Sequence, residues 1–415
     1  MFIAAFYRPQ YGAPPLSLGN AQTSLAFRSL TRGGHNGALL AAKIRNKSQP
    51  LFIFHNFFVP LHRNMDKKTK IVFIVNPISG TTDKKRIIEL IPKSLEGGNF
   101  EWSICKTEHK GHAAELAREA AEQGVDVVVA VGGDGTVNEV ARSLIHTDTA
   151  LGIIPCGSGN GLARHLFIPM NPEGALQVLA ECQIKQLDYG MIDQEPFFCT
   201  CGVGFDAFIS DRFAKSKRRG LLSYIENTLK EGVKYKPDTY EITIDGEKQV
   251  YKAFLIACAN ANQYGNNVYI APHASMSDGL MDVTLMEPFT LLEAPQIAIQ
   301  LIKKTITTNS HIRTFRCQHL HIKRSAPGVI HFDGDPKDAG AELDIRLIPK
   351  GIRMVVNTRE QPYTPPLLHA FTDFYHNVQE GITTMRADLK AEIKEGQHRI
   401  SNTSKELMKK LRKKP

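Results

Sequence analysis

Three glycine-rich turns hold the residues of this sequence that are best suited to chemistry. The richest is Gly132-Gly-Asp-Gly-Thr-Val-Asn138, which follows the apolar run Val127–Val131. Because glycine has no Cβ atom, successive backbone N–H groups in such a turn can point into one concavity that suits a phosphate group. A helix expected from Thr136 adds the positive end of its dipole. The same residues are also compatible with an ordinary glycine-rich turn between a strand and a helix.

Two companion turns follow other apolar segments. Asn76-Pro-Ile-Ser-Gly80 follows Lys70–Val75, and Gly157-Ser-Gly-Asn-Gly161 follows Ala150–Pro155. If these segments are parallel strands of one sheet, the three turns line one crevice at the carboxyl ends of the strands. Side chains that can donate hydrogen bonds to phosphate oxygens are Ser79, Thr107, Thr136, Asn138, Ser158 and Asn160. Neither a P-loop nor the dinucleotide-binding G-x-G-x-x-G pattern with a following acidic residue is present.

The elements that position these turns alternate between strands and helices. Apolar runs predict strands at 70–75, 100–105, 127–131 and 150–155, with helices between them. This order predicts an N-terminal α/β domain at 65–190 with a mostly parallel open sheet. From residue 191 to 355 we predict a β-rich, antiparallel domain. Its strands are predicted at 196–203, 238–245, 248–259, 280–286, 316–324, 328–333 and 341–348.

The three turns, in this order, resemble the motifs of a known superfamily. Gly132–Val140, with Asn76–Gly80 before it and Gly157–Asn160 after it, is similar to the motifs of the diacylglycerol and sphingosine kinase superfamily of lipid kinases. The similarity covers about residues 68–350 and is strongest to the bacterial soluble diacylglycerol kinase-like branch. It implies an NAD kinase/diacylglycerol kinase-like α/β domain and a C-terminal antiparallel β-sandwich for the lipid substrate, with ATP between them.

The resemblance also implies which residues bind ATP and Mg²⁺. Those expected at the nucleotide are Asn76, Pro77, Ser79, Gly80, Thr107, Gly132, Gly133, Asp134, Gly135, Thr136, Asn138, Gly157, Ser158, Asn160 and Asp335. Asp134 is expected to organise the Mg²⁺ of the nucleotide and its waters, and Asp188 matches an acidic position of the same network. A structural Mg²⁺ is implied at the Asp278 side chain and the carbonyl groups of Ser275 and Leu280. A simple turn is the alternative for this loop.

Asp333 is the residue that we expect to act as the general base. It lies in His331-Phe-Asp-Gly-Asp335, which resembles the Asp-Gly-Glu motif of the family. An alcohol loses its proton as it attacks the γ-phosphoryl group, and a carboxylate at hydrogen-bond distance can accept that proton. The residues alone leave a hairpin turn open as an alternative, which is our interpretation of Asp245-Gly246.

Two positions depart from the family pattern. Gly161 stands where diacylglycerol kinases usually have Asp, which weakens the expected metal–water network and favours the sphingosine kinase-like form of the motif. Asp335 stands in place of Glu and is one methylene shorter, so its nucleotide contact is expected to run through water or the metal. Both changes bear on the identity of the acceptor more than on the reaction class.

The excess positive charge lies near the start of the chain. The formal net charge is +9, from 51 basic and 42 acidic residues, and residues 1–64 hold seven of the basic and none of the acidic residues. The remainder is near neutral, so a general nucleic-acid-binding surface is not expected. The seven cysteines show no C-x-x-C spacing and are expected to be reduced thiols of a cytoplasmic protein. No apolar run approaches the roughly 20 residues of a membrane-spanning helix.

Both ends of the chain have their own patterns. Residues 1–64 lack periodicity and are expected to be a disordered leader, either a transit peptide or the product of a start codon placed before Met65. Residues 360–415 predict a basic amphipathic helix that docks on the body, pairs with a second copy or contacts an anionic membrane. Lys215-Ser-Lys-Arg-Arg219, beside a helix expected at 221–234, is either a solvated surface or a site for lipid headgroups.

These patterns predict an ATP- and Mg²⁺-dependent kinase that phosphorylates a lipid hydroxyl, as a cytoplasmic or peripheral membrane protein. An NAD kinase-like phosphotransferase is one alternative, since it shares Gly-Gly-Asp-Gly-Thr, although Asn138-Glu-Val140 argues against it. A catalytically weak regulator that binds nucleotide or lipid is another, because of Gly161 and Asp335. The acceptor lipid is not identified, since lipid pockets consist of interchangeable apolar side chains.

Overall fold

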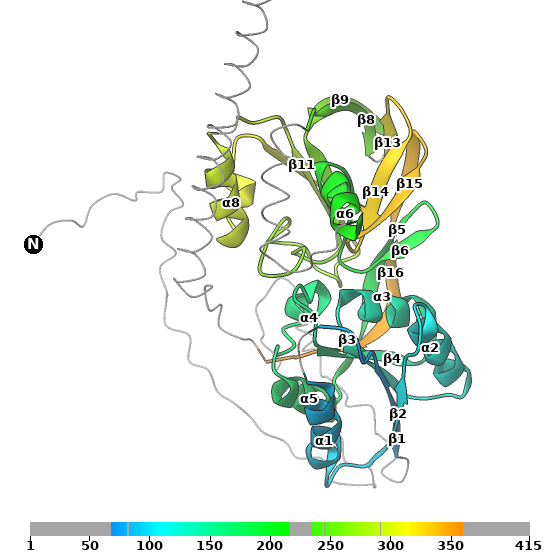
Figure 1. Cartoon of the computed structure of the whole chain (residues 1–415). Helices are drawn as coiled ribbons and strands as arrows, with labels where there is room; N and C mark the ends of the chain where they lie inside the picture. Colours follow the sequence, from blue (N-terminus) through cyan, green and yellow to red (C-terminus); the bar gives the residue numbers. More distant parts are fainter. Residues whose placement is uncertain (1–67, 81–82, 216–234, 245, 291, 360–415) are drawn as a thin grey trace, which may run out of the picture. The chain divides into compact units, whose positions relative to one another are not determined.

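The computed structural model describes residues 68–359, apart from 81–82, 216–234, 245 and 291 (Figure 1). The predicted leader at 1–64, the tail at 360–415, the helix at 221–234 and most of the basic stretch 215–219 lie outside the described residues. In the part of the chain that is described, no helix is long and apolar enough to cross a membrane.

Four parallel strands form one end of the larger sheet. They are β1 (Thr69–Val75), β2 (Phe100–Lys106), β3 (Val127–Gly132) and β4 (Ala150–Pro155), in the order β2-β1-β3-β4. Every residue of β3 and β4 is buried. Such strands are covered on both faces, which explains their uninterrupted apolar sequences. The strand order reverses between β1 and β3, and ligands of open α/β sheets bind at such a point.

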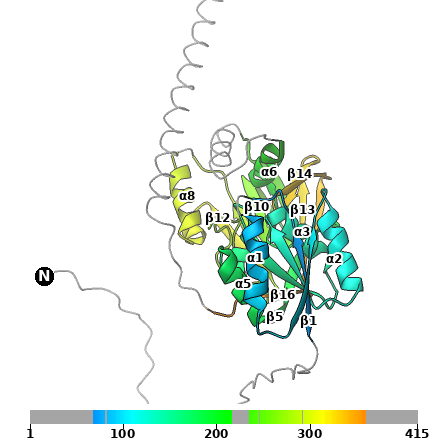
Figure 2. The same ribbon diagram turned by 60° about the horizontal axis from the view of Figure 1, so that its bottom comes forward.

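Helices cover both faces of these parallel strands. α1 (Lys84–Leu95) packs beside α5 (Pro172–Glu181) on one face, and α2 (His112–Glu122) packs beside α3 (Asp134–Ser143) on the other (Figure 2). The short helix α4 (Gly161–His165) follows β4. The predicted N-terminal α/β domain is therefore confirmed.

The long strand β16 (Glu342–Val355) belongs to both ends of the larger sheet. Its C-terminal part lies parallel to β4, with Met354 opposite Leu151. Its N-terminal part pairs with β13 (His319–Arg324) in antiparallel orientation. One strand therefore connects the parallel and the antiparallel parts.

Other strands extend the antiparallel part around β16. β5 (Ile184–Ile192) pairs with β16 along both of its parts, and β6 (Glu195–Phe197) pairs with β5. β8 (Asp238–Ile244) and β9 (Glu247–Ala253) follow β13. Within the described residues the sheet has ten strands, and the predicted boundary at 190 lies inside β5.

A smaller antiparallel sheet forms the other layer of the C-terminal domain. Its order is β12 (Ile312–Cys317), β11 (Met281–Met286), β10 (Leu255–Ala259), β7 (Thr200–Gly204), β14 (Gly328–Phe332) and β15 (Asp335–Ala339). Val203 of this sheet and Ile345 of the larger sheet belong to one buried core. The predicted C-terminal antiparallel β-sandwich is therefore confirmed.

Two helices pack on the outer face of the smaller sheet. α6 (Phe205–Lys215) contacts β7, β14 and β15. Ile209 of α6, Ile297 of α8 (Ala294–Ile302) and Ala257 of β10 belong to one apolar cluster. This face is thus buried beneath helices, as is the face inside the sandwich.

Three segments that the sequence predicts as single strands are divided in the structure. The breaks lie at Phe198–Cys199 in 196–203, at Phe254 in 248–259 and at Gln318 in 316–324. At each break the chain passes from one sheet to the other. Apolar periodicity does not report such a crossing, because buried apolar residues continue on both sides of each break.

Asp188 fastens the irregular middle of β16 to a neighbouring loop. Its side chain is buried, and its two carboxylate oxygens accept hydrogen bonds from the backbone N–H groups of Lys350 (2.7 Å) and Gly279 (2.9 Å). Lys350 lies in the register shift of β16 and has φ +53°. The carboxylate thus satisfies backbone donors that the strand ladder leaves without an acceptor.

We expect Asp188→Ala to lower the free energy of unfolding by about 2–4 kcal/mol, because two N–H groups lose their acceptor and a buried side chain is truncated. Equilibrium unfolding in urea measures the change. Asp148→Ala serves as the control, since that side chain is exposed and its loss should change the free energy by less than about 0.5 kcal/mol. Equal free energies for the two variants would contradict this role of Asp188.

Candidate active site

The first two glycine-rich turns are joined by a side-chain hydrogen bond. Asn76 follows β1, and its Nδ2 donates to Oγ1 of Thr136 over 3.0 Å. Thr136 lies in the first turn of α3, which begins at Asp134, two residues before the predicted start. Gly132 leaves the space that Thr136 needs, because a Cβ atom at position 132 would lie 2.5 Å from the Thr136 Cβ. The two turns therefore meet where the strand order reverses.

Asp134 joins the second turn to the third. Its Oδ2 accepts a hydrogen bond from the Asn160 N–H group (2.9 Å), and its Oδ1 accepts one from the Gly161 N–H group (2.8 Å). A negative charge in the first turn of α3 is also favoured by the helix dipole. Asp134 thus holds the third turn through its backbone.

The glycines of the three turns make direct backbone contacts. A Cβ atom at Gly157 would lie 2.8 Å from Cα of Gly133 in the second turn. A Cβ atom at Gly80, in the first turn, would lie 1.6 Å from the carbonyl oxygen of Cys156. The absence of Cβ atoms therefore lets the three turns form one continuous backbone surface.

The predicted nucleotide contacts differ in accessibility. Pro77, Gly135 and Ser158 are exposed, whereas Thr107 is buried at the end of β2. Asn160 closes its own turn: its Nδ2 donates to the Gly157 carbonyl oxygen (2.8 Å), and its Oδ1 accepts from the Gly157 N–H group (3.0 Å). In the first turn, Oγ of Ser79 donates to the Asn76 carbonyl oxygen over 3.1 Å.

Asp333 lies in a hairpin turn and also reaches the glycine turns. Asp333 and Gly334 connect β14 to β15 with φ +49° and +88°, the signs of a type I′ turn. The Asp333 Oδ2 accepts hydrogen bonds from Nδ2 of Asn138 (2.7 Å) and from the Phe198 N–H group (2.9 Å). Asn138 belongs to α3, so this contact joins the sandwich to the α/β domain. The two alternatives for Asp333, turn and site residue, are thus compatible.

Both oxygens of Asp333 are fully engaged. Oδ1 accepts hydrogen bonds from the N–H groups of Cys199 (2.7 Å) and Thr200 (3.1 Å). Burial raises the pKa of the carboxyl group, and the Asn138 amide and the three backbone N–H groups act in the opposite direction. A carboxylate offers about four lone-pair positions, so these donors saturate it. Asn138 is the donor on a rotatable side chain, and a hydroxyl group could take its place.

α3 contacts the sandwich at a second point, one helical turn after Asn138. Nη1 of Arg142 lies 3.0 Å from Oε2 of Glu195, and its guanidinium group lies 4.8 Å from the centre of the Phe332 ring. Nζ of Lys337 on β15 lies 2.6 Å from the other oxygen of Glu195. These contacts hold the β14–β15 hairpin, and thus Asp333, against α3. Asp335, by contrast, is exposed at the start of β15.

The loop at 260–280, between β10 and β11, covers the third turn with its first part, residues 260–274, which holds none of the predicted site residues. The Asn266 N–H group donates to the Gly159 carbonyl oxygen (3.1 Å), as does Nε of Arg164 (2.9 Å). Gly265 has φ +112°, and a Cβ atom there would lie 3.0 Å from the Gly159 backbone. One signal for this loop was available in the sequence: loops longer than about 12–15 residues are uncommon and usually functional.

Comparison with known proteins agrees with this architecture. Residues 70–192 match the family model of the diacylglycerol kinase catalytic domain, and residues 199–356 match that of the YegS C-terminal NAD kinase beta sandwich-like domain. A Chromohalobacter salexigens protein named "Probable lipid kinase YegS-like" is 30% identical over 255 residues, which are 60% of this chain and 81% of the relative. The chain belongs to the diacylglycerol kinase family of lipid kinases.

Further relatives of this lipid kinase family member span most of the described residues. The diacylglycerol kinase of Mycobacterium tuberculosis is 27% identical over 287 residues, which are 64% of this chain and 88% of that protein. The crystal structure of a diacylglycerol kinase of Bacillus anthracis has a TM-score of 0.56 at 22% identity, over 70% of this chain and 97% of that chain. At this identity, the solved structure supports the fold alone.

The two magnesium sites predicted for this kinase family member differ in how well their residues fit a cation. Each oxygen of Asp134 accepts one N–H group, which leaves lone pairs on both oxygens for a hard cation such as Mg²⁺. Oδ1 of Asp278 accepts from the Leu280 N–H group, and Oδ2 is paired with the guanidinium group of Arg316. Because Arg316 supplies the positive charge, the loop does not fit a cation in this geometry. Asp188 contacts this loop, and none of its hydrogen bonds reaches Asp134.

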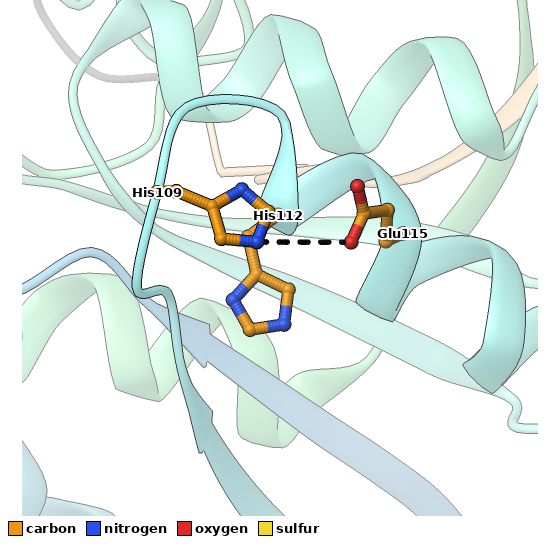
Figure 3. A group of neighbouring side chains, drawn as sticks. All are labelled: His109, His112 and Glu115. Atoms are coloured by element: carbon orange, nitrogen blue, oxygen red, sulfur yellow. Dashed lines mark ion pairs between the residues drawn. The ribbon is translucent and has the colours of Figure 1, made fainter.

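Another group of side chains with metal-binding chemistry lies at the start of α2. Among the described residues, His109, His112 and Glu115 bring one ligand atom each to within 4.8 Å of one another (Figure 3). The two imidazole rings are stacked, with centroids 4.6 Å apart and an angle of 7° between their planes. The lone pairs of imidazole lie in the ring plane, and a metal ion cannot lie in two parallel, stacked planes. This group is therefore not arranged as a metal site.

Gly157→Ala and Gly135→Ala form a matched pair that tests the contact between the turns. We expect Gly157→Ala to lower stability by about 1–3 kcal/mol, because its Cβ atom must push Gly133 away. Nothing lies within 4 Å of a Cβ atom at Gly135, in the first turn of α3, so Gly135→Ala should keep or raise stability. Thermal unfolding followed by circular dichroism compares the two. A similar Tm for both variants would mean that the turns do not touch as described.

Proposed function

We propose that this member of the lipid kinase family transfers the γ-phosphoryl group of ATP to a hydroxyl group of a lipid. The observation that carries the proposal is the 2.7 Å hydrogen bond between Asn138 of α3 and the Asp333 carboxylate. Through this bond, a carboxylate from the sandwich lies beside the helix that follows the richest glycine turn. Membership of the diacylglycerol kinase family supports a lipid as the acceptor.

ATP is expected to bind along the surface formed by the three turns. The backbone N–H groups of Gly132–Gly135 and the positive end of the α3 dipole attract phosphate oxygens. Pro77 and Ser158 are exposed in the first and third turns, where they are available to a nucleotide. Mg²⁺ bound with the nucleotide would neutralise charge on the transferred group, and Asp134 is the residue that we expect to hold it.

Asp333 is proposed to accept the proton of the acceptor hydroxyl. The hydroxyl group replaces the Asn138 amide at Oδ2, while the three backbone N–H groups keep the carboxylate in position. As the proton passes to Asp333, the hydroxyl oxygen bonds to the γ-phosphorus, the bond to the β-phosphate oxygen breaks, and ADP leaves. Burial raises the pKa of Asp333, which makes its ionised form a stronger base.

Labelled ATP and a total lipid extract test this proposal. We expect label from the γ-phosphate to appear in a lipid product, identified by its mass, when Mg²⁺ is present. Asp333→Asn should bind ATP as the unmodified protein does and lower the transfer rate by at least about 100-fold, because general base catalysis is lost. Asp338→Asn is the matched control, since that carboxylate is exposed on the neighbouring β15.

Each alternative has its own outcome in the same assay. Transfer of label to NAD and to no lipid would replace the proposal with an NAD kinase-like activity. ATP binding without transfer to any lipid would support a regulator. Transfer by Asp333→Asn at nearly the unmodified rate would remove Asp333 from the mechanism.

The pH dependence of the reaction tests the link between Asn138 and Asp333. The base must be ionised, so kcat/KM for the acceptor should fall as pH decreases through the pKa of Asp333, which burial raises above 3.8. Asn138→Ala removes a donor that lowers this pKa, so the acidic limb should move to higher pH. The profile is measured at saturating ATP. An acidic limb at the same pH in Asn138→Ala and in the unmodified protein would show that Asn138 does not affect the titration of the base.

A further inference from the structure

Alternate residues of β14 face opposite sides of the smaller sheet. Ile330 and Phe332 belong to the core between the sheets, so His331 faces the outer side. Asp333 follows β14 directly, in the hairpin turn, two positions after His331. His331 is therefore the outward-facing strand position nearest in sequence to the proposed base.

Asp206 of α6 holds His331 in a buried pair. His331 Nε2 lies 3.0 Å from Oδ2 of Asp206, and the two side chains are only 2% and 8% exposed. The same oxygen accepts a hydrogen bond from the hydroxyl group of Tyr264 (3.2 Å), and Oδ1 accepts one from the Ala207 N–H group (2.7 Å). Gly202 on β7 makes room for the pair, since a Cβ atom there would lie 2.6 Å from Oδ2 of Asp206.

The other ring nitrogen of His331, Nδ1, is buried and has no hydrogen-bond partner among the described residues. A carboxylate oxygen only accepts hydrogen bonds, so Nε2 carries the proton of the neutral ring and Nδ1 is an acceptor. A buried acceptor without a donor costs about 1–3 kcal/mol. A carboxylate that fixes one ring nitrogen, so that the other can bind a hydroxyl group, is a known arrangement of Asp–His pairs.

An aromatic cluster continues from this polar pair. Phe205, directly before Asp206, packs against Phe254 with ring centres 4.4 Å apart, and Phe254 packs against Phe289 at 4.8 Å. Ile297 of α8 belongs to the same buried cluster. On this side of the smaller sheet, the buried polar pair thus lies between the turn that holds Asp333 and a buried apolar cluster. This is also the order of reacting hydroxyl, headgroup and chain in a lipid.

We propose that Nδ1 of His331, oriented by Asp206, accepts a hydrogen bond from a second polar group of the acceptor lipid. This inference rests on the proposed lipid kinase function and narrows its substrate class. The acceptor carries a hydrogen-bond donor, a hydroxyl or an amine, within a few bonds of the hydroxyl group that is phosphorylated. A diacylglycerol has only ester oxygens there, so a monoacylglycerol or a long-chain amino alcohol is the better substrate.

A set of acceptors that differ in this one group tests the proposal. We compare 1-oleoylglycerol, its 2-O-methyl ether, dioleoylglycerol and sphingosine in detergent micelles, with the full-length protein, labelled ATP and Mg²⁺. The 2-O-methyl ether keeps the reacting hydroxyl and loses only the donor. We expect kcat/KM to be at least about tenfold higher for the better of the two donor-bearing acceptors, 1-oleoylglycerol and sphingosine, than for the ether or dioleoylglycerol.

Asp206→Asn is expected to change Nδ1 of His331 from a hydrogen-bond acceptor into a donor, while a side chain of the same size remains at position 206. The amide oxygen keeps the Ala207 N–H group, and the amide NH₂ group faces His331, so Nε2 becomes an acceptor and the proton moves to Nδ1. The ratio of kcat/KM between lipids that carry the second hydrogen-bond donor and lipids that lack it should then fall to about one or invert. Asp211→Asn, further along α6 and paired with Lys215 at the surface, should keep the original preference. Imidazole ¹⁵N shifts report the tautomer of His331 independently of activity.

Each outcome decides one of the two proposals. If the unmodified protein and Asp211→Asn prefer lipids with the second donor and Asp206→Asn does not, the proposed contact between Nδ1 of His331 and that donor is supported. Equal or better use of the ether or dioleoylglycerol by the unmodified protein, or an unchanged preference in Asp206→Asn, overturns this inference and leaves the lipid kinase proposal standing. Nδ1 then contacts only a buried water. Absence of transfer to every lipid, including a total extract, overturns the proposed function and this inference with it.

Discussion

A carboxylate that is partly removed from water needs donors for its lone pairs, and Asp333 obtains them from parts of the chain that are far apart in sequence. The break between β6 and β7 supplies the N–H groups of Phe198 and Cys199, the first residue of β7 supplies that of Thr200, and α3 supplies the Asn138 amide. The type I′ turn aims the carboxylate at them. A shift of the sandwich relative to α3 would remove the Asn138 donor from a partly buried charge, so the geometry of the site and the packing of the two domains depend on the same contact.

Properties that depend on adjacent residues could be predicted from the sequence. The glycine spacing and the apolar runs predict the parallel strands and the three turns, and Asp333-Gly334 predicts its hairpin. Contacts that depend on distant strands could not be predicted. The pattern around Asp278 indicates a cation site, but Arg316 on β12 occupies its carboxylate. The pairing of Asp206 with His331 likewise arises because β14 and α6 meet in the fold, and neither residue has a local signal for it.

The loop at 260–280 connects the proposed nucleotide side of the site to the proposed acceptor side. Through Gly265 and Asn266 it packs on the third glycine turn, and through Tyr264 it reaches the Asp206–His331 pair. A Cβ atom at Gly161 would lie 3.3 Å from the Tyr264 carbonyl oxygen. The glycine at this position, where the family usually has Asp, therefore permits a close approach of the loop. The departure from the family pattern at position 161 is thus linked to the packing of the loop, besides the expected metal–water network.

The shared strand β16 has a consequence for how the protein is made. It pairs with β4 in the parallel sheet, yet it follows every strand of the sandwich in the chain. During synthesis, the α/β domain leaves the ribosome long before the strand that completes its sheet. Until then β4 has an unpaired edge, to which another chain can add, and pairing between such distant segments is slow. Pairing of β4 with β16 therefore has to compete with the addition of another chain at that edge.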